Sequence, residues 1–238
     1  MPMTKPTCRI CSKTYTDRGM TRHLQSCLKK HGDSRRTTHL RVTDRWDSTF
    51  WMQLVADEDA TLDELDLLLR NVWLECCGHL SEFEIDATRY DPGAGGSMFS
   101  FGPPTESTDT PIARVLPDGM DFSYTYDFGS STYLEGTSYG DAPWPRKLQV
   151  DSPESITGIQ VLARNEMPRF ECTHCDRAAE WICSDCQWHD EGFLCTVHAR
   201  EHPCGHDMLL PVVNSPRLGI CGYSGSQLDR VDYSALRP

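Results

Sequence analysis

Two clusters of cysteine and histidine, one near each end of the 238-residue chain, constrain the fold more than any other feature. The first follows the pattern Cys-x2-Cys-x11-His-x3-Cys from Cys8 to Cys27, and the second lies between Cys172 and His206. Cysteines two residues apart direct both sulfurs to one point about 2.3 Å away, which is the geometry of tetrahedral zinc. The 12 cysteines include three outside these clusters, which are Cys76, Cys77 and Cys221.

A disulfide scaffold is the competing interpretation of so many cysteines. Disulfide-rich domains are usually short and secreted, whereas this chain is long and residues 1–13 are polar and basic, without the apolar segment of a signal peptide. No stretch approaches the roughly 18 apolar residues that a membrane span requires. The sequence therefore favours zinc over disulfides and predicts a cytoplasmic protein without membrane contact.

The first cluster predicts a ββα zinc finger at residues 8–27. His23 and Cys27 are four residues apart, so a helix places both on one face. Tyr15 and Met20 supply a miniature apolar core that is too small to fold unaided, and we expect zinc to supply the folding free energy. The four expected ligands are Cys8, Cys11, His23 and Cys27.

Charge is divided unevenly along the chain, whose net charge is −12. Residues 1–45 hold 11 lysines and arginines against three acidic residues, and the net charge of residues 46–238 is −20. A basic arm on an acidic body is typical of proteins that contact nucleic acid. The alternatives are that the arm folds back on its own acidic body or that the finger binds protein. The residues expected to contact nucleic acid are Arg18, Arg22, Lys29, Lys30, Arg35 and Arg36.

Residues 37–165 contain no zinc spacing and must supply the main core. The clearest helix begins after Thr61, which forms a capping box with Glu64, and apolar residues then recur at helical spacing as far as Cys76. Alternating patterns predict strands at residues 39–43, 50–55, 79–85, 120–126, 132–135, 148–150 and 158–163. The sum is an α+β domain with a mainly antiparallel sheet and one dominant helix.

Two connections in this domain have distinct compositions. Residues 91–119 are rich in Gly, Pro, Ser and Thr, which predicts a long mobile segment. Asp127, Phe128 and Gly129 separate two alternating segments, which predicts a hairpin whose Gly129 takes a positive φ.

The second cluster holds six cysteines and five histidines within residues 172–206, enough for two tetrahedral zinc ions. The last two ligands come from His202, Cys204 and His206; we favour His202 with Cys204, because a thiolate is the stronger ligand, and keep His206 in reserve. His174 and His189 are expected to be bystanders. The eight expected ligands are Cys172, Cys175, Cys183, Cys186, Cys195, His198, His202 and Cys204.

An interleaved cross-brace would pair Cys172 and Cys175 with Cys195 and His198, as in B-box modules. A sequential arrangement would place the cysteines from 172 to 186 around one zinc, but its loop of seven residues is shorter than the roughly 12 of a zinc ribbon. Both arrangements fill every zinc position with protein ligands, which is typical of structural sites. The aromatic and aliphatic residues among the ligands are expected to form the core of the module, and an exposed one would indicate a peptide-binding surface; they are Trp181, Trp188, Phe193 and Leu194.

Two motifs of the central domain are His79-Leu80-x-x-Phe83-x-Ile85 and Tyr124-x-Tyr126-Asp127-Phe128-Gly129. With the helix from Thr61, they make residues 37–165 similar to the plasmid pRiA4b ORF-three-like family, some members of which are insertion-element passenger proteins. Residues 210–223 resemble the tail of a zinc-bearing subgroup. Many relatives follow the second motif with an acidic residue and a tryptophan, where this chain has Ser130, Ser131 and Thr132. The resemblance implies an α+β fold and no established activity.

We predict a non-enzymatic protein with three zinc ions per chain. It is expected to contact nucleic acid through residues 1–45 and protein through residues 172–206, with no small-molecule substrate. The predicted domains are the finger arm at 1–36, the α+β core at 37–165 and the two-zinc module at 166–238, whose tail docks on the core. The alternatives are an adaptor that binds only protein and an enzyme that uses His79 and Asp127 as an acid–base pair.

Overall fold

The computed structural model describes residues 5–93, 105–148, 155–156, 158–189 and 191–226. The chain divides into two compact units, each formed from two separate segments. Met1–Leu69 and Leu80–Glu166 form the first unit, whereas Arg70–His79 and Met167–Pro238 form the second. Among the described residues no helix is both long enough and apolar enough to cross a membrane.

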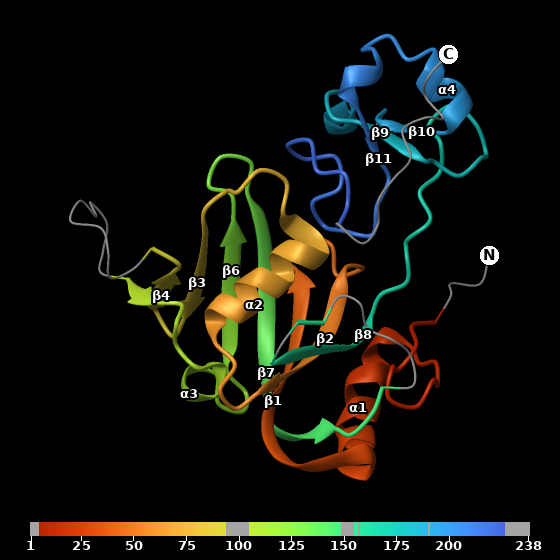
Figure 1. Ribbon diagram of the computed structural model, residues 1–238. Helices are drawn as coiled ribbons and strands as arrows, with labels where there is room; N and C mark the ends of the chain where they lie inside the picture. The colour runs from red at the N-terminus through yellow and green to blue at the C-terminus, as the bar shows by residue number, and fades with distance from the viewer. Residues whose placement is uncertain (1–4, 94–104, 149–154, 157, 190, 227–238) are drawn as a thin grey trace. The chain divides into compact units, whose positions relative to one another are not determined.

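An eight-stranded sheet forms the centre of the first unit (Figure 1). Its strands, in spatial order, are β5 (Glu106–Ser107), β4 (Thr88–Asp91), β3 (Ser81–Ile85), β6 (Asp121–Tyr126), β7 (Thr132–Pro145), β1 (Gly32–Asp44), β2 (Trp51–Asp57) and β8 (Ile159–Arg164). All neighbours are antiparallel except β4 and β5. The predicted α+β class with a mainly antiparallel sheet is confirmed.

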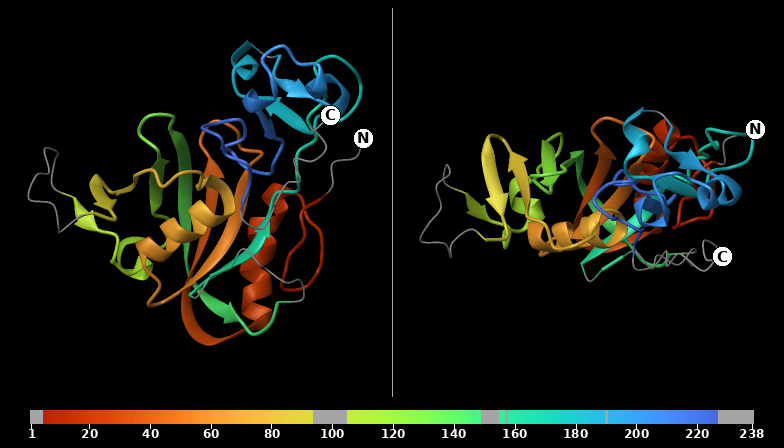
Figure 2. Two further views of the ribbon diagram at one scale, coloured as in Figure 1. Left: turned by 45° about the horizontal axis from the view of Figure 1, so that its top comes forward. Right: turned by 90° about the horizontal axis from the view of Figure 1, so that it is seen from above.

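Helices α1 (Asp17–His31) and α2 (Leu62–Leu69) lie on opposite faces of this sheet (Figure 2). Tyr124 of β6 donates a hydrogen bond of 2.6 Å from its hydroxyl to Asp66 of α2. On the other face, the amide of Gln53 in β2 donates to the hydroxyl of Thr21 in α1 at 2.6 Å. The apolar sides of both helices are therefore covered by the sheet.

The start of α2 follows the predicted capping box. The Thr61 N–H donates to the Glu64 carboxylate at 2.9 Å, and the Glu64 N–H donates to the Thr61 hydroxyl at 3.3 Å. Two further N–H groups of the first turn, which a helix cannot satisfy itself, donate to the carbonyls of Thr108 and Thr110. The expectation of a mobile segment at 91–119 is therefore wrong for its second part, which also contains β5 and α3 (Ile112–Val115). Residues 94–104 lie outside the described part of the chain.

The end of this helix differs from the prediction of an α-helix reaching Cys76. After Leu69 the chain forms a π-helical turn at Arg70–Leu74, in which the Glu75 N–H donates to the Arg70 carbonyl at 2.9 Å. The side chains of Arg70 and Glu75 form an ion pair of 3.0 Å across the same turn. The hydrogen bond of a π-helical turn encloses one residue more than that of an α-helix. Single π-helical turns often occur at functional sites.

The hairpin between β6 and β7 forms as predicted, but the residue with positive φ is Asp127, at 64°, and not Gly129. The Asp127 carboxylate accepts the Gly129 N–H at 2.9 Å, and this local bond stabilises the turn. Leu148 is not in a strand, and residues 149–150 of the strand predicted at 148–150 lie outside the described residues.

The finger helix shares its apolar core with the sheet. Met20, Leu24 and Leu28 of α1 are fully buried. Together with Cys27 of the same helix, they belong to one cluster with residues of the finger turn, β2, β7 and β8, namely Cys8, Ile10, Trp51, Val55, Trp144, Leu162 and Ala163. Burial of each large side chain contributes about 1.5–3 kcal/mol, so the sheet stabilises α1 together with any bound metal.

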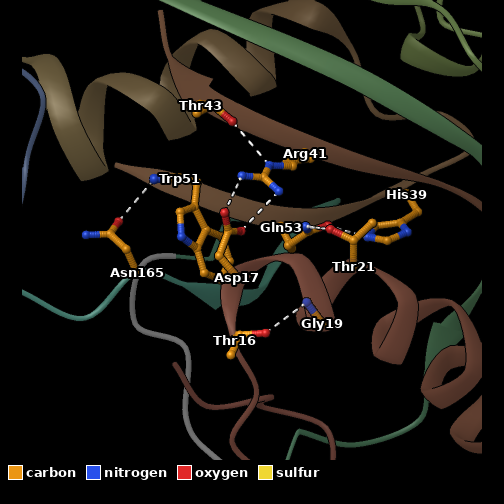
Figure 3. A network of polar contacts seen from close by, with 10 residues as sticks. All are labelled: Thr16, Asp17, Gly19, Thr21, His39, Arg41, Thr43, Trp51, Gln53 and Asn165. Atoms are coloured by element: carbon orange, nitrogen blue, oxygen red, sulfur yellow. Dashed lines mark hydrogen bonds and ion pairs between the residues drawn. The ribbon is translucent and has the colours of Figure 1, made fainter. Parts of the chain in front are cut away.

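Polar contacts also fix α1 on β1 and β2 (Figure 3). Arg41 of β1 pairs with Asp17 at 3.0 Å, and the His39 ring lies 2.8 Å from the Gln53 amide oxygen. Thr16 caps the helix by accepting the Gly19 N–H at 3.3 Å. Burial lowers the pKa of His39 to about 4, which keeps this ring neutral near neutral pH.

The second unit contains a three-stranded sheet of β10 (Phe193–Leu194), β9 (Trp181–Cys183) and β11 (Leu209–Pro211), together with the short helix α4 (Thr196–Arg200). The tail was expected to dock on residues 37–165. Its strand β11 pairs with β9, and the Ser215 hydroxyl then donates at 2.6 Å to the carbonyl of Trp73, which lies within those bounds. Trp73 belongs to the segment 70–79 of the same unit.

Replacing Leu24 by alanine tests the shared core. Because Leu24 is fully buried between α1 and the sheet, we expect Leu24→Ala to lower the free energy of unfolding of the first unit by about 2–5 kcal/mol. Leu67→Ala is the matched control, since Leu67 is 49% exposed on α2 and should change stability by less than about 1 kcal/mol. Equal effects in chemical denaturation would contradict the shared core.

The buried His39 predicts a pH dependence. Its native pKa of about 4 lies below the ordinary 6.5, so between these values the unfolded chain binds the additional proton and stability falls as the pH is lowered. We expect wild type to lose up to about 1.4 kcal/mol per pH unit more than His39→Gln across this window. Urea unfolding of both proteins, which carry the same cysteines, checks the difference; parallel curves would refute it.

Candidate metal centres

Four groups of side chains have the composition and geometry of metal sites. Each consists of three cysteines and one histidine whose ligand atoms all lie within 4.8 Å of one another. The groups are Cys8, Cys11, His23 and Cys27; Cys76, Cys77, His79 and Cys221; Cys172, Cys175, Cys195 and His198; and Cys183, Cys186, His202 and Cys204. All 12 cysteines of the chain are free thiols, and every one belongs to a group.

The distances within the groups fit a tetrahedral ion. With zinc bonds of about 2.3 Å to sulfur and about 2.0 Å to nitrogen, ligands at tetrahedral angles lie about 3.8 Å apart for two sulfurs and about 3.5 Å apart for sulfur and nitrogen. The sulfur pairs Cys8–Cys27, Cys76–Cys77, Cys77–Cys221, Cys175–Cys195 and Cys186–Cys204 are separated by 4.0, 3.7, 3.8, 3.9 and 3.5 Å. A disulfide would require about 2.05 Å, so the thiols are placed for a shared ion.

The finger site combines a tight turn with one face of α1. Cys8 and Cys11 precede the helix, and the Ser12 N–H donates to the Cys8 carbonyl at 2.8 Å, which closes the turn. His23 stacks on Tyr15 with ring centroids 3.9 Å apart and places Nε2 3.3 Å from the Cys11 sulfur. Burial lowers the pKa of His23 and raises the pKa of Cys8. A neutral imidazole can ligate, while ionisation of the buried thiol needs a cation such as zinc.

The first site of the C-terminal module joins a turn to helix α4. Cys195 is the N-cap of α4, and His198 on that helix places Nδ1 3.2 Å from the Cys172 sulfur and 3.5 Å from the Cys195 sulfur. A hydrogen bond from the Arg177 guanidinium, at 3.3 Å, lowers the pKa of Cys175 to about 7. One ligand of this site is therefore close to ionisation at neutral pH.

The second site of the module contains Cys183 from β9 and Cys186 from the following 3₁₀ turn, with His202 and Cys204. The pKa of Cys186 is raised to about 12 by its hydrogen bond with Cys204 and by burial. His206 is outside the group and points its Nε2 to the Arg200 carbonyl at 3.3 Å. The ligands of the two sites alternate along the chain, so the structure has the cross-braced order rather than the sequential one.

The group at Cys76, Cys77, His79 and Cys221 was not predicted. Cys76, Cys77 and His79 are close in sequence, but Cys221 follows 142 residues after His79. Neither segment contains two cysteines separated by two residues, which is the spacing typical of a zinc site. The adjacent cysteines followed by histidine were the available signal. Their partner could be found only from the fold of the second unit.

The six expected nucleic-acid residues are all exposed but fall into two sets. In β1, Arg36 forms an ion pair with Asp141 at 2.9 Å, and Arg35 lies 3.7 Å from Asp57 and 3.2 Å from Asp33. The other set has no ion pair to any described residue and consists of Arg18, Arg22, Lys29 and Lys30 of α1.

The structure also bears on the predictions made for His79 and for Trp188. His79 was a candidate acid–base residue with Asp127, but its Nε2 faces Cys77 and Cys221 at 2.9 and 3.3 Å, so its ring belongs to a metal-type group. Trp188 was expected in the core of the C-terminal module and is instead 70% exposed. Trp181 and Leu194 are buried as expected, and Phe193 stacks on Phe170 with centroids 4.6 Å apart.

Comparison with known proteins adds little. No protein-family model and no curated protein matches the chain. Among solved structures it is similar to MM3350, a protein of unknown function from Methanosarcina mazei Go1, with 20% identity and a TM-score of 0.36. The match covers 49% of this chain and 66% of MM3350, which is just under two thirds of that protein.

The ligand set of the second module site can be tested by zinc counting. Cys204→Ala should lower the zinc content by about one ion per chain, because the variant removes one of four ligands. His206→Ala is the matched control and should retain the wild-type content, since His206 belongs to none of the four groups and its Nε2 faces the Arg200 carbonyl. Elemental analysis of dialysed protein gives the ratio, and loss of zinc from the control would show that His206 is the ligand.

Proposed function

We propose that this protein is a non-enzymatic, zinc-stabilised binding protein that contacts nucleic acid through the exposed basic side of α1. The observation that carries the proposal is that the basic residues of this helix have no acidic partner among the described residues, unlike those of β1. The zinc ions would be structural, because each group supplies four protein ligands and leaves no position for a reacting water.

The orientation of α1 supports the proposal. Asp17, Thr21 and Leu24 face the sheet, while Arg18, Arg22 and Lys29 follow one another at spacings of four and seven residues on the exposed side. Residues four and seven apart occupy the same side of a helix. A row of cations without internal partners can neutralise phosphates and release their counterions.

Bases of a duplex are a less suitable target than phosphates. A finger that reads base pairs inserts its helix into the major groove, whereas α1 is covered along one side by the sheet and its first turn is bound by Arg41. The proposed contact is therefore with the backbone and carries no sequence preference.

The C-terminal module would bind protein. Trp188 is 70% exposed next to the ligand Cys186, and Val197 of α4 is 47% exposed. Tryptophan is enriched among the residues that carry most of the binding energy at protein interfaces. A pure adaptor is the second candidate function, and an absence of nucleic-acid binding would favour it.

We also propose that residues 37–165 belong to the plasmid pRiA4b ORF-three-like family. The two motifs on which the resemblance rests lie side by side in the sheet. Phe83 of β3 and Tyr124 of β6 pack with ring centroids 4.6 Å apart, and Asp127 forms the turn after β6. This assignment supports the fold and adds no activity.

The function is tested by fluorescence polarisation with duplex DNA, single-stranded DNA and RNA over a salt series. Deletion of the basic arm is unsuitable, because residues 1–45 include β1 from the interior of the sheet. We expect the neutral variant Arg18→Gln/Arg22→Gln/Lys29→Gln to weaken binding and to reduce the slope of log K against log salt by about 2–3.

The matched control is Arg35→Gln/Arg36→Gln on the same arm. These arginines already pair with Asp57 and Asp141, so the control should keep the wild-type salt slope. Circular dichroism and zinc content establish that both variants are folded. Equal binding by wild type and the α1 variant would reject α1 as the contact surface, and no binding by any form would favour the adaptor.

A further inference from the structure

The group of Cys76, Cys77, His79 and Cys221 lies outside both predicted zinc modules, yet it has the same composition of three cysteines and one histidine as the other three. Its four ligand atoms come from two segments of the second unit. The other three groups contain nine of the 12 cysteines, and this group contains the remaining three.

The first segment is shaped to converge its side chains. The π-helical turn ends at Leu74, and the Glu75 carboxylate then accepts the Gly78 N–H, which closes a tight turn around Cys76 and Cys77. Gly78 adopts a φ of 76°, which favours glycine, and leads the chain into His79. Glu75 is itself held by Arg70 at 3.0 Å.

The second segment is brought to the first by the tail of the chain. The Tyr223 hydroxyl donates to the Val72 carbonyl at 3.4 Å, and the Ser215 hydroxyl donates to the Trp73 carbonyl at 2.6 Å. Cys221 lies between these two anchors with a φ of 51°, an unfavourable conformation for a non-glycine residue. The tail is also bound by Gln187, which donates to the Gly219 carbonyl at 2.6 Å.

Exposure distinguishes this group from the others. The other groups each have at least one cysteine that is at most 5% exposed, whereas none of the four residues here is buried, and Cys77 and Cys221 are exposed. Burial around a metal site controls the access of solvent and competing ligands. An ion held here would be reached by a chelator more easily than ions in the finger or the cross-braced module.

We propose that Cys76, Cys77, His79 and Cys221 form a fourth zinc site that fastens the tail at residues 215–223 to the segment 70–79 and exchanges its metal faster than the other three. The donor set of three sulfurs and one nitrogen suits tetrahedral zinc. The ion would link positions 79 and 221, so its binding free energy would stabilise the folded tail.

Zinc counting is the primary test. We expect the full chain, refolded with zinc and dialysed, to hold about four ions, and Cys221→Ser and His79→Ala each to hold about three. His189→Ala is the matched control, because His189 is exposed and belongs to no group, and it should keep the wild-type count. A wild-type count that is unchanged in both ligand variants would overturn the fourth site.

Two further measurements test separately how fast the site loses its metal and how well the tail is ordered. A colorimetric zinc chelator should withdraw one ion from wild type at least about tenfold faster than the rest, and this fast phase should be absent from Cys221→Ser. Hydrogen exchange at residues 218–223 should accelerate in Cys221→Ser and in chelator-treated wild type, but not in His189→Ala. A single withdrawal phase in wild type, or unchanged exchange in the tail, would contradict the proposal. Neither result depends on nucleic-acid binding.

Discussion

Two groups of thiols and imidazole, composed and spaced to hold metal, are the constraint on which the C-terminal module at residues 172–211 depends. The core of this module contains few large apolar side chains and includes a candidate ligand, since its buried cluster consists of Trp181, Cys183, Leu194, Ala199 and Leu209. Burial of such a set contributes several kcal/mol at about 1.5–3 kcal/mol per large side chain, whereas ordering each residue costs about 1–2 kcal/mol. Zinc in small domains contributes about 10–16 kcal/mol per ion, so ions bound at the two groups of this module would supply the stability that its apolar core cannot.

The finger uses the same chemistry in a different setting. Its four candidate ligands bring the turn at Cys8 and Cys11 to one side of α1, while Leu24 and Leu28 on the same helix are buried in a cluster that includes residues of β2 and β8. Isolated fingers depend on zinc because they have no other core. Here the sheet stabilises part of the helix, and a bound ion would fix the position of the turn.

The sequence predicted most of the elements because their signals are local. Thr61 and Glu64 are three residues apart, and the strand alternation in β6 and β7 extends over only a few residues, so each pattern was visible without the fold. The positive φ of Asp127 and the exposure of Trp188 were missed, because both depend on packing around a turn. The fourth group was missed for a stronger reason. Cys221 meets His79 only after the tail has folded, and no spacing rule covers such a separation.

The junction between α1 and β1 determines which part of the basic arm remains open to a partner. Gly32 ends the helix and begins the strand, and a Cβ at this position would collide with Pro143 and approach the Leu28 carbonyl to 2.7 Å. The chain therefore turns sharply there, close against β7. Residues after Gly32 enter the sheet, where Arg36 meets Asp141. Residues before it stay on the helix with their cations facing outward, so one contiguous basic segment of sequence becomes one neutralised strand and one exposed cationic surface.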